Sequence, residues 1–157
     1  GKFAPQGGNG STAVKATAGA FGDVNATTRE LNARAHRLYY TKPHNYPGAI
    51  ASWTESLSLD PRQQELYPHL TFALYQTRQY DNCMHYGEAC LQVATSSEIR
   101  AGCLRNLGIC QWLAGYRTEA RASLAKALQQ SDSAKGHATS QALSDKLESG
   151  QGVTAWP

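Results

Sequence analysis

Four cysteines are the residues of this chain whose chemistry and spacing stand out. Cys83 and Cys90 lie seven residues apart, Cys103 and Cys110 are separated by the same seven, and a Ser-Ser pair lies between the two sets. Seven residues make almost two turns of an α-helix, so each set would lie on one face of its helix. Thiols in this arrangement can form disulfides, bind a metal ion or fill helix contacts as small apolar side chains.

The Ser-Ser break at 96–97 determines which thiols can meet. It predicts two antiparallel helices joined by a short turn, and facing residues of such a pair have a constant sum of residue numbers. Cys83 and Cys110 sum to 193, as do Cys90 and Cys103. We therefore predict two disulfides, Cys83–Cys110 and Cys90–Cys103. Each would stabilise the fold by roughly 2–4 kcal/mol, mainly by restricting the unfolded chain.

Two other interpretations remain open. Free thiols at Cys83 and Cys90 would also suit helix contacts that need small side chains, although this leaves the symmetry unexplained. One zinc ion would need four sulfurs at about 2.3 Å, whereas the two pairs lie about 10 Å apart along the helices. We expect no metal ion and no other cofactor. If the disulfides form, the compartment is oxidising, such as the periplasm or the extracellular space.

No set of residues predicts a catalytic site. Cys83 and His85 lie two residues apart and so point to nearly opposite faces of a helix, which excludes a Cys–His pair. The five histidines show no i,i+4 metal spacing within one helix. No glycine-rich loop follows a strand, so phosphate-binding motifs lack their context. We expect the chain not to be an enzyme.

The composition restricts the possible classes of protein further. Apolar residues make up 41% and charged residues 17% of the 157 residues, which is typical of a globular domain. The net charge of +3 comes without clusters of Lys and Arg, so we expect no nucleic-acid partner. No run of 18 apolar residues is present, so no membrane span is predicted.

The chain changes character near Thr27. Residues 1–26 are rich in Gly, Ala, Ser and Thr, nearly uncharged and without periodicity, and they predict a flexible arm. Thr27 and Glu30 have the spacing of a capping box, so the first helix is expected to begin there. From that point to about Gln130, helical patterns alternate with short breaks and no alternating β-branched run occurs. The fold class is therefore all-α.

Three of the expected helices resemble one another. Each begins with a tyrosine, has small residues at two fixed positions and a leucine after the second: Tyr46, Ala49, Ser56 and Leu57; Tyr80, Cys83, Cys90 and Leu91; Tyr116, Ala120, Ala127 and Leu128. The interval from the first of these helices to the second is nearly the same as that from the second to the third. A helix pair of this length cannot bury its own apolar face and must stack on the next pair.

The stretch LRNLGICQWLAGY from Leu104 to Tyr116, with Ala120 and Ala127, resembles the tetratricopeptide repeat family, as does the stretch from Ala49 to Pro61. The resemblance implies a right-handed superhelix of stacked antiparallel helix pairs. Its repeats would be residues 28–61, 62–96 and 97–131 of a helical domain that spans 27–148. A capping helix at 137–148 and a tail at 149–157 would follow.

Two departures from the family pattern are visible. The first helix of repeat one, LNARAHRLYY, lacks the Leu-Gly pair. Pro68 lies where the first helix of repeat two should begin, and proline is tolerated only in the first turn of a helix. We therefore expect that helix to begin at about Tyr67.

In this family the first helices of the pairs line a concave groove that binds peptides. Carried onto this sequence, the groove positions are Arg34, Leu38, Lys42, His69, Phe72, Tyr75, Gln76, Arg105, Asn106, Ile109 and Trp112. This mixture suits an extended peptide or a short helix, in particular one with acidic residues. The alternative is that the apolar members are core and the charged members a solvated face. Leu38 and His69 occupy positions where the family's carboxylate clamp has Asn, so no clamp is expected.

These observations predict a non-catalytic interaction or scaffold module in a secreted or periplasmic assembly of the cell envelope. It would bind a peptide or helix of another protein, and its N-terminal arm would tether it to a larger protein or a membrane anchor. A second hypothesis is a cytoplasmic chaperone of the same repeat type, with reduced cysteines and secreted proteins as clients. A third is a subunit of an enzyme whose catalytic part lies elsewhere.

Overall fold

The computed structural model describes residues 10–131 and 133–150, with side chains from residue 24 onward. Within these residues every regular element is helical. The elements are α1 (Gly10–Tyr40), α2 (Tyr46–Leu59), the 3₁₀ helix η1 (Gln64–Leu66), α3 (Tyr67–Gln76), α4 (Tyr80–Val93), α5 (Ser97–Leu113), α6 (Arg117–Gln130) and α7 (Ala134–Glu148). The predicted all-α class is confirmed.

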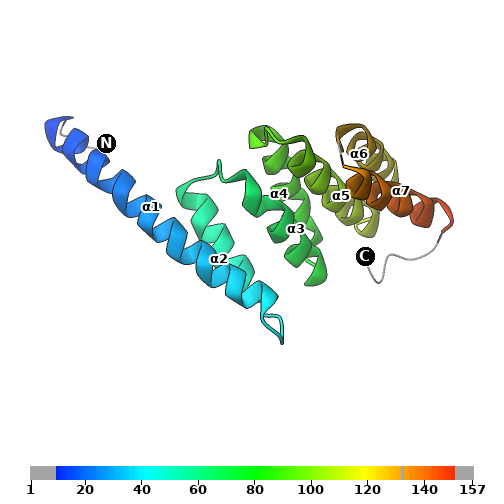
Figure 1. Ribbon diagram of the computed structural model, residues 1–157, viewed down its shortest axis with the longest axis horizontal. Helices are drawn as coiled ribbons and strands as arrows, with labels where there is room; N and C mark the ends of the chain where they lie inside the picture. Colours follow the sequence, from blue (N-terminus) through cyan, green and yellow to red (C-terminus); the bar gives the residue numbers. More distant parts are fainter. Residues whose placement is uncertain (1–9, 132, 151–157) are drawn as a thin grey trace.

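The helices form hairpins that follow one another along the long axis of the molecule (Figure 1). The pairs are α1 with α2, α3 with α4, and α5 with α6, and successive pairs meet through α2 with α3 and α4 with α5. The first helices of the last two pairs also touch, α3 against α5, and α7 packs on both α5 and α6. The helix α7 thus occupies the place of the first helix of a fourth pair.

Small residues allow the helices to approach closely. Ala49, Cys83 and Ala120, which share the first small position, have no exposed surface. Gly108 of α5 faces α6, and a Cβ added there would lie 3.0 Å from Leu124 Cγ. A larger side chain at Gly108 would therefore push α5 and α6 apart.

Helix ends follow local sequence signals. Asn45 caps α2 by accepting a hydrogen bond from the Gly48 amide at 2.9 Å, and Ser96 caps α5 through the Ile99 amide at 3.3 Å. The end of α5 passes into Gly115, whose φ of +98° favours glycine. Pro68 lies in the first turn of α3, which begins at Tyr67 as predicted.

The first helix begins much earlier than expected. The sequence predicts a flexible arm over residues 1–26 and a helix start at Thr27, but α1 begins at Gly10. Inside this helix the Thr28 hydroxyl donates to the Asn25 carbonyl at 3.0 Å, so the Thr27–Glu30 box does not mark a helix start. Several alanines and the absence of proline in residues 10–26 favour a helix despite the glycines. Residues 1–9 and 151–157 lie outside the described part.

The helix α1 has 31 residues, whereas its partner α2 has 14. As a result, the first half of α1 projects beyond α2 at one end of the molecule (Figure 1).

Two side chains hold the turns between helix pairs in a similar way. The Gln64 side-chain oxygen accepts hydrogen bonds from the amides of Thr95 and Ser96 at 2.9 and 3.1 Å. Glu98, in the first turn of α5, accepts a hydrogen bond from the Ser133 amide at 2.6 Å. Side chains of η1 and of the first turn of α5 therefore fix the turns that lead into the next helix pairs.

Candidate functional site

The four cysteine sulfurs meet in the two predicted pairs. Cys83 Sγ lies 2.05 Å from Cys110 Sγ, and Cys90 Sγ lies 2.22 Å from Cys103 Sγ. The Cα atoms are 6.3 and 6.5 Å apart, and no cysteine has exposed surface. Both pairs join α4 to α5, which belong to different helix pairs, so the disulfides connect the second repeat to the third.

Aromatic side chains of α1 and α3 form the largest ring assembly on the described part of the molecule. We call it the aromatic cluster and define it as His36, Tyr39, Tyr40, His69, Phe72 and Tyr75. The Tyr39 ring centroid lies 5.5 Å from that of His69 and 6.1 Å from that of Phe72. On its other side the same ring contacts Trp53 of α2 at 5.2 Å. Tyr39 therefore links the first hairpin to α3.

Part of the aromatic cluster is open to solvent. Tyr40 is 50% exposed, His36 is exposed, and Phe72 and His69 are half-buried. The Tyr40 hydroxyl lies 2.9 Å from His69 Nε2, a hydrogen bond between α1 and α3. The cluster thus offers accessible ring surface next to half-buried and buried rings.

Burial shifts the pKa values of the less exposed residues of the aromatic cluster. It raises the pKa of Tyr39 and of Tyr75 far above the ordinary value, so both phenols are neutral. It lowers the pKa of His69, and the nearby His36 adds to this, while a hydrogen bond to the Glu65 backbone opposes it. The Tyr75 hydroxyl is buried without a hydrogen bond of good geometry, although the Gln76 amide is nearby.

The candidates on α5 are occupied by neighbouring helices. Arg105 Nη1 donates to the Gly136 carbonyl at 3.3 Å and to the Ser140 hydroxyl at 3.2 Å, which ties α5 to α7. Burial lowers the pKa of Arg105, and the nearby Glu98 opposes this shift. Ile109 has no exposed surface and belongs to the core.

Asn106 and Trp112 also make contacts within the fold. Asn106 Nδ2 donates to the Pro68 carbonyl and to the Thr71 hydroxyl, both at 2.9 Å, and so fixes α5 to α3. The Trp112 ring lies beneath two guanidinium groups of α6, those of Arg117 at 4.7 Å and Arg121 at 5.4 Å. Both side chains therefore contribute to packing between helices.

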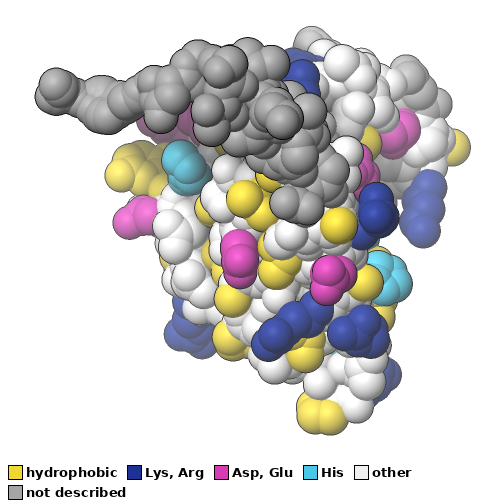
Figure 2. All heavy atoms as spheres, turned by 90° about the vertical axis from the view of Figure 1, so that its left-hand side faces the viewer, with side chains coloured by type: hydrophobic (Ala, Val, Ile, Leu, Met, Phe, Trp, Pro, Cys, Tyr) yellow, Lys and Arg dark blue, Asp and Glu magenta, His cyan; other side chains and the backbone are white. Residues whose placement is uncertain are grey.

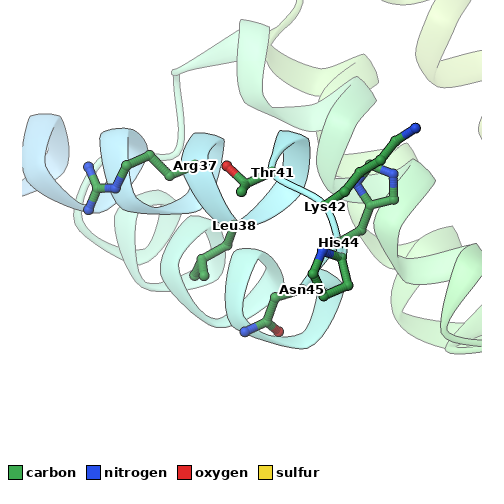
Figure 3. A pocket seen from close by; sticks show the side chains of 7 residues that line it. Arg37, Leu38, Thr41, Lys42, His44 and Asn45 are labelled. Atoms are coloured by element: carbon green, nitrogen blue, oxygen red, sulfur yellow. The ribbon is translucent and has the colours of Figure 1, made fainter.

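The candidates on α1 lie away from the aromatic cluster. Leu38 points toward α2 (Figure 3), where a Cβ added to Gly48 would lie 2.9 Å from Leu38 Cδ1. Leu38 and Lys42 line an open pocket of about 670 Å³ at the α1–α2 turn, together with Arg37, Thr41, Pro43, His44 and Asn45. Arg34 is exposed one turn before Leu38. The contacts of α1 with α3 pass instead through Tyr39 and Tyr40.

Figure 2 shows the molecule from this end. Apolar side chains are scattered among charged ones on the face in view and form no continuous patch on the described residues there. In the pocket, the Arg37 and Lys42 side chains extend in different directions (Figure 3), so they do not converge on one point.

A search of solved structures finds a similar protein, the N-terminal domain of stress-induced protein-1 (STI-1) from C. elegans. The two align with a TM-score of 0.62 over 76% of this chain and 96% of that domain, at 14% sequence identity. The fold is that of a tetratricopeptide repeat domain. No family model matches the sequence, and no curated protein matches it either.

The buried positions of the repeats show how α1 aligns with α3 and α5. In the second and third repeats, Thr71 precedes Cys83 by the same interval at which Gly108 precedes Ala120, and both Thr71 and Gly108 are buried. The same interval before Ala49 leads to Arg37, which is exposed.

The buried residue at this point of α1 is instead Ala35, which has no exposed surface and lies two positions earlier than Arg37. The α1–α2 turn is therefore two residues longer than its counterparts. With this shift, His36 and Tyr39 of α1 are the residues equivalent to Phe72 and Tyr75 of α3.

In the described residues, no three His, Cys, Asp or Glu side chains are grouped so that they would hold a metal ion. Across the same part of the chain, no helix combines the length and apolar character needed to cross a membrane.

Proposed function

We propose that this chain is a non-catalytic interaction module that binds a segment of another protein on the concave side lined by α1, α3 and α5. The observation that carries the proposal is the aromatic cluster. Tyr40 and His36 leave ring surface exposed beside the half-buried ring of Tyr39 and the buried ring of Tyr75. Aromatic side chains on a rigid base are typical of the residues that dominate binding energy at protein interfaces.

The proposed setting is an oxidising compartment, such as the periplasm or the extracellular space. Two buried cysteine pairs at bonding distance support it, because structural disulfides persist in such compartments and are rare in the cytosol. The pairs join the second repeat to the third, so they would hold the curvature of the groove fixed.

The projecting half of α1 is the proposed attachment point to a larger assembly. It extends beyond α2, and it would hold the domain at a distance from whatever precedes it (Figure 1). A helix in this place makes a stiffer spacer than the flexible arm that the composition predicts.

Site-specific photo-crosslinking tests the proposed binding face. A photo-reactive phenylalanine analogue replaces Tyr40 in one variant and Tyr116 in another, since these tyrosines are 50% and 51% exposed but lie on different helix pairs. After illumination in the native compartment, the Tyr40 variant is expected to yield a discrete adduct with one partner segment, and the Tyr116 variant none. Equal adducts from both positions, or none from Tyr40, would contradict binding on the concave face.

A further inference from the structure

The charge at the aromatic cluster bears on the kind of segment that it can bind. The aromatic cluster contains no carboxylate, ammonium or guanidinium group, and the neighbouring Gln76 is an exposed neutral amide. Two of the basic residues that the family resemblance assigns to the groove make contacts outside the aromatic cluster. Arg105 donates to α7, and Lys42 lines the pocket at the α1–α2 turn.

This charge distribution disfavours an acidic partner. A carboxylate that was pressed onto the rings of Tyr40 and Phe72 would lose water without gaining a counter-charge, which is unfavourable. Proline rings and aliphatic side chains, in contrast, pack well on aromatic faces and bury their surface there.

Polar groups at the cluster's edge suit a peptide backbone. Gln76 offers an amide that can both donate and accept, and His36 and the Tyr40 hydroxyl are exposed beside the rings.

We infer that the groove recognises an extended, uncharged segment of another protein, rich in proline and aliphatic residues and without acidic side chains. Its apolar side chains lie on Tyr40 and Phe72, and its backbone hydrogen-bonds to Gln76 and His36. This inference rests on the proposed function and names the chemistry of its partner.

The test is a selection of displayed random dodecapeptides on the oxidised domain. Individual selected peptides are then synthesised, and their dissociation constants are measured by fluorescence anisotropy. The retained peptides are expected to be enriched in proline and aliphatic residues and depleted in Asp and Glu. Tyr40→Ala should weaken their binding at least tenfold, whereas Tyr116→Ala, which removes an equally exposed tyrosine, should leave it within twofold.

The outcomes separate the inference from the proposed function. Retained peptides rich in Asp and Glu would overturn the uncharged-partner inference and keep the interaction module. Apolar peptides that bind Tyr40→Ala and Tyr116→Ala equally well would overturn the assignment to the aromatic cluster. A library that yields no binder to the folded domain would overturn the proposed function itself.

Discussion

The Tyr40 hydroxyl lies 2.9 Å from Nε2 of His69, and this contact joins the last residue of α1 to the first turn of α3. It lies inside the aromatic cluster, so one hydrogen bond connects the packing of the first two repeats with the proposed binding surface. The protonation of His69 should therefore affect both.

The fold is expected to lose stability as the pH falls below 6.5, the ordinary pKa of histidine. Burial lowers the pKa of His69 in the folded state, while the unfolded chain keeps the ordinary pKa. Below that value the unfolded state binds more protons than the folded state. The free energy of unfolding therefore falls as the pH is lowered. The groups that face the ring are His36, Tyr39 and Tyr40 of α1, Trp53 of α2 and the backbone of Glu65.

Urea unfolding at pH 7.5 and 5.5 measures this effect in the wild type and in His69→Gln, whose amide can still bond to Tyr40. The loss of stability between the two pH values should be smaller in the variant. An identical loss in both proteins would show that His69 does not titrate as its burial implies.

The disulfides should differ modestly in their contribution to stability. Cys83–Cys110 closes a loop with a sequence separation of 27 and Cys90–Cys103 one of 13. On the loop-entropy estimate, replacing the first pair by alanine should cost about 3.5 kcal/mol and replacing the second about 3 kcal/mol. Denaturant unfolding of Cys83→Ala/Cys110→Ala and Cys90→Ala/Cys103→Ala measures both values. Double variants as stable as the wild type would mean that neither bridge restricts the unfolded chain.

Two glycines of α5 provide a matched pair for testing helix contacts. A Cβ at Gly108 would lie 3.0 Å from Leu124 Cγ and 3.3 Å from the Ala120 carbonyl, whereas a Cβ at Gly102 meets nothing closer than 3.7 Å. Gly108→Ala should destabilise the fold by about 1–2 kcal/mol, because overpacking outweighs the helix propensity of alanine. Gly102→Ala should be neutral or stabilising by up to about 1 kcal/mol. Thermal unfolding compares them, and the reverse order would refute the close approach of α5 and α6.

Glu98 should control the docking of α7. Its carboxylate accepts from the Ser133 amide and from the Ser131 hydroxyl, at 2.6 and 3.2 Å to Oε1. Glu98→Ala removes these acceptors, so the amides of α7 should exchange with deuterium at least several-fold faster than in the wild type. Glu98→Gln keeps an acceptor oxygen and should remain close to the wild type. Unchanged exchange in Glu98→Ala would place the anchoring of α7 elsewhere, for example at Arg105.

The cysteine pairing was predictable because it depends on few quantities. The position of the turn and the antiparallel direction of two helices fix which residues face each other, and both follow from the Ser-Ser break at 96–97. The repeat pattern was visible because small residues such as Ala49, Cys83 and Ala120 return at nearly equal intervals.

The groove was harder to predict, for two physical reasons. The two extra residues in the α1–α2 turn shift the register of α1, and only the burial of Ala35 instead of Arg37 reveals the shift. On α5 the sequence indicates a helix face but not its neighbour, so Arg105 looked available although α7 takes it up. The alanines before residue 27 favour a longer α1. The glycines among them disfavour a helix and so made this start hard to predict.

The bridging of the second and third repeats is the feature on which both the rigidity of the module and its proposed compartment depend. A free-thiol titration of the protein isolated from its native source, denatured without reductant, tests it most directly, with peptide mapping to identify the linked cysteines. We predict no free thiols and cross-linked peptides for Cys83 with Cys110 and for Cys90 with Cys103. Four titratable thiols would contradict this prediction and favour a reduced, cytoplasmic protein.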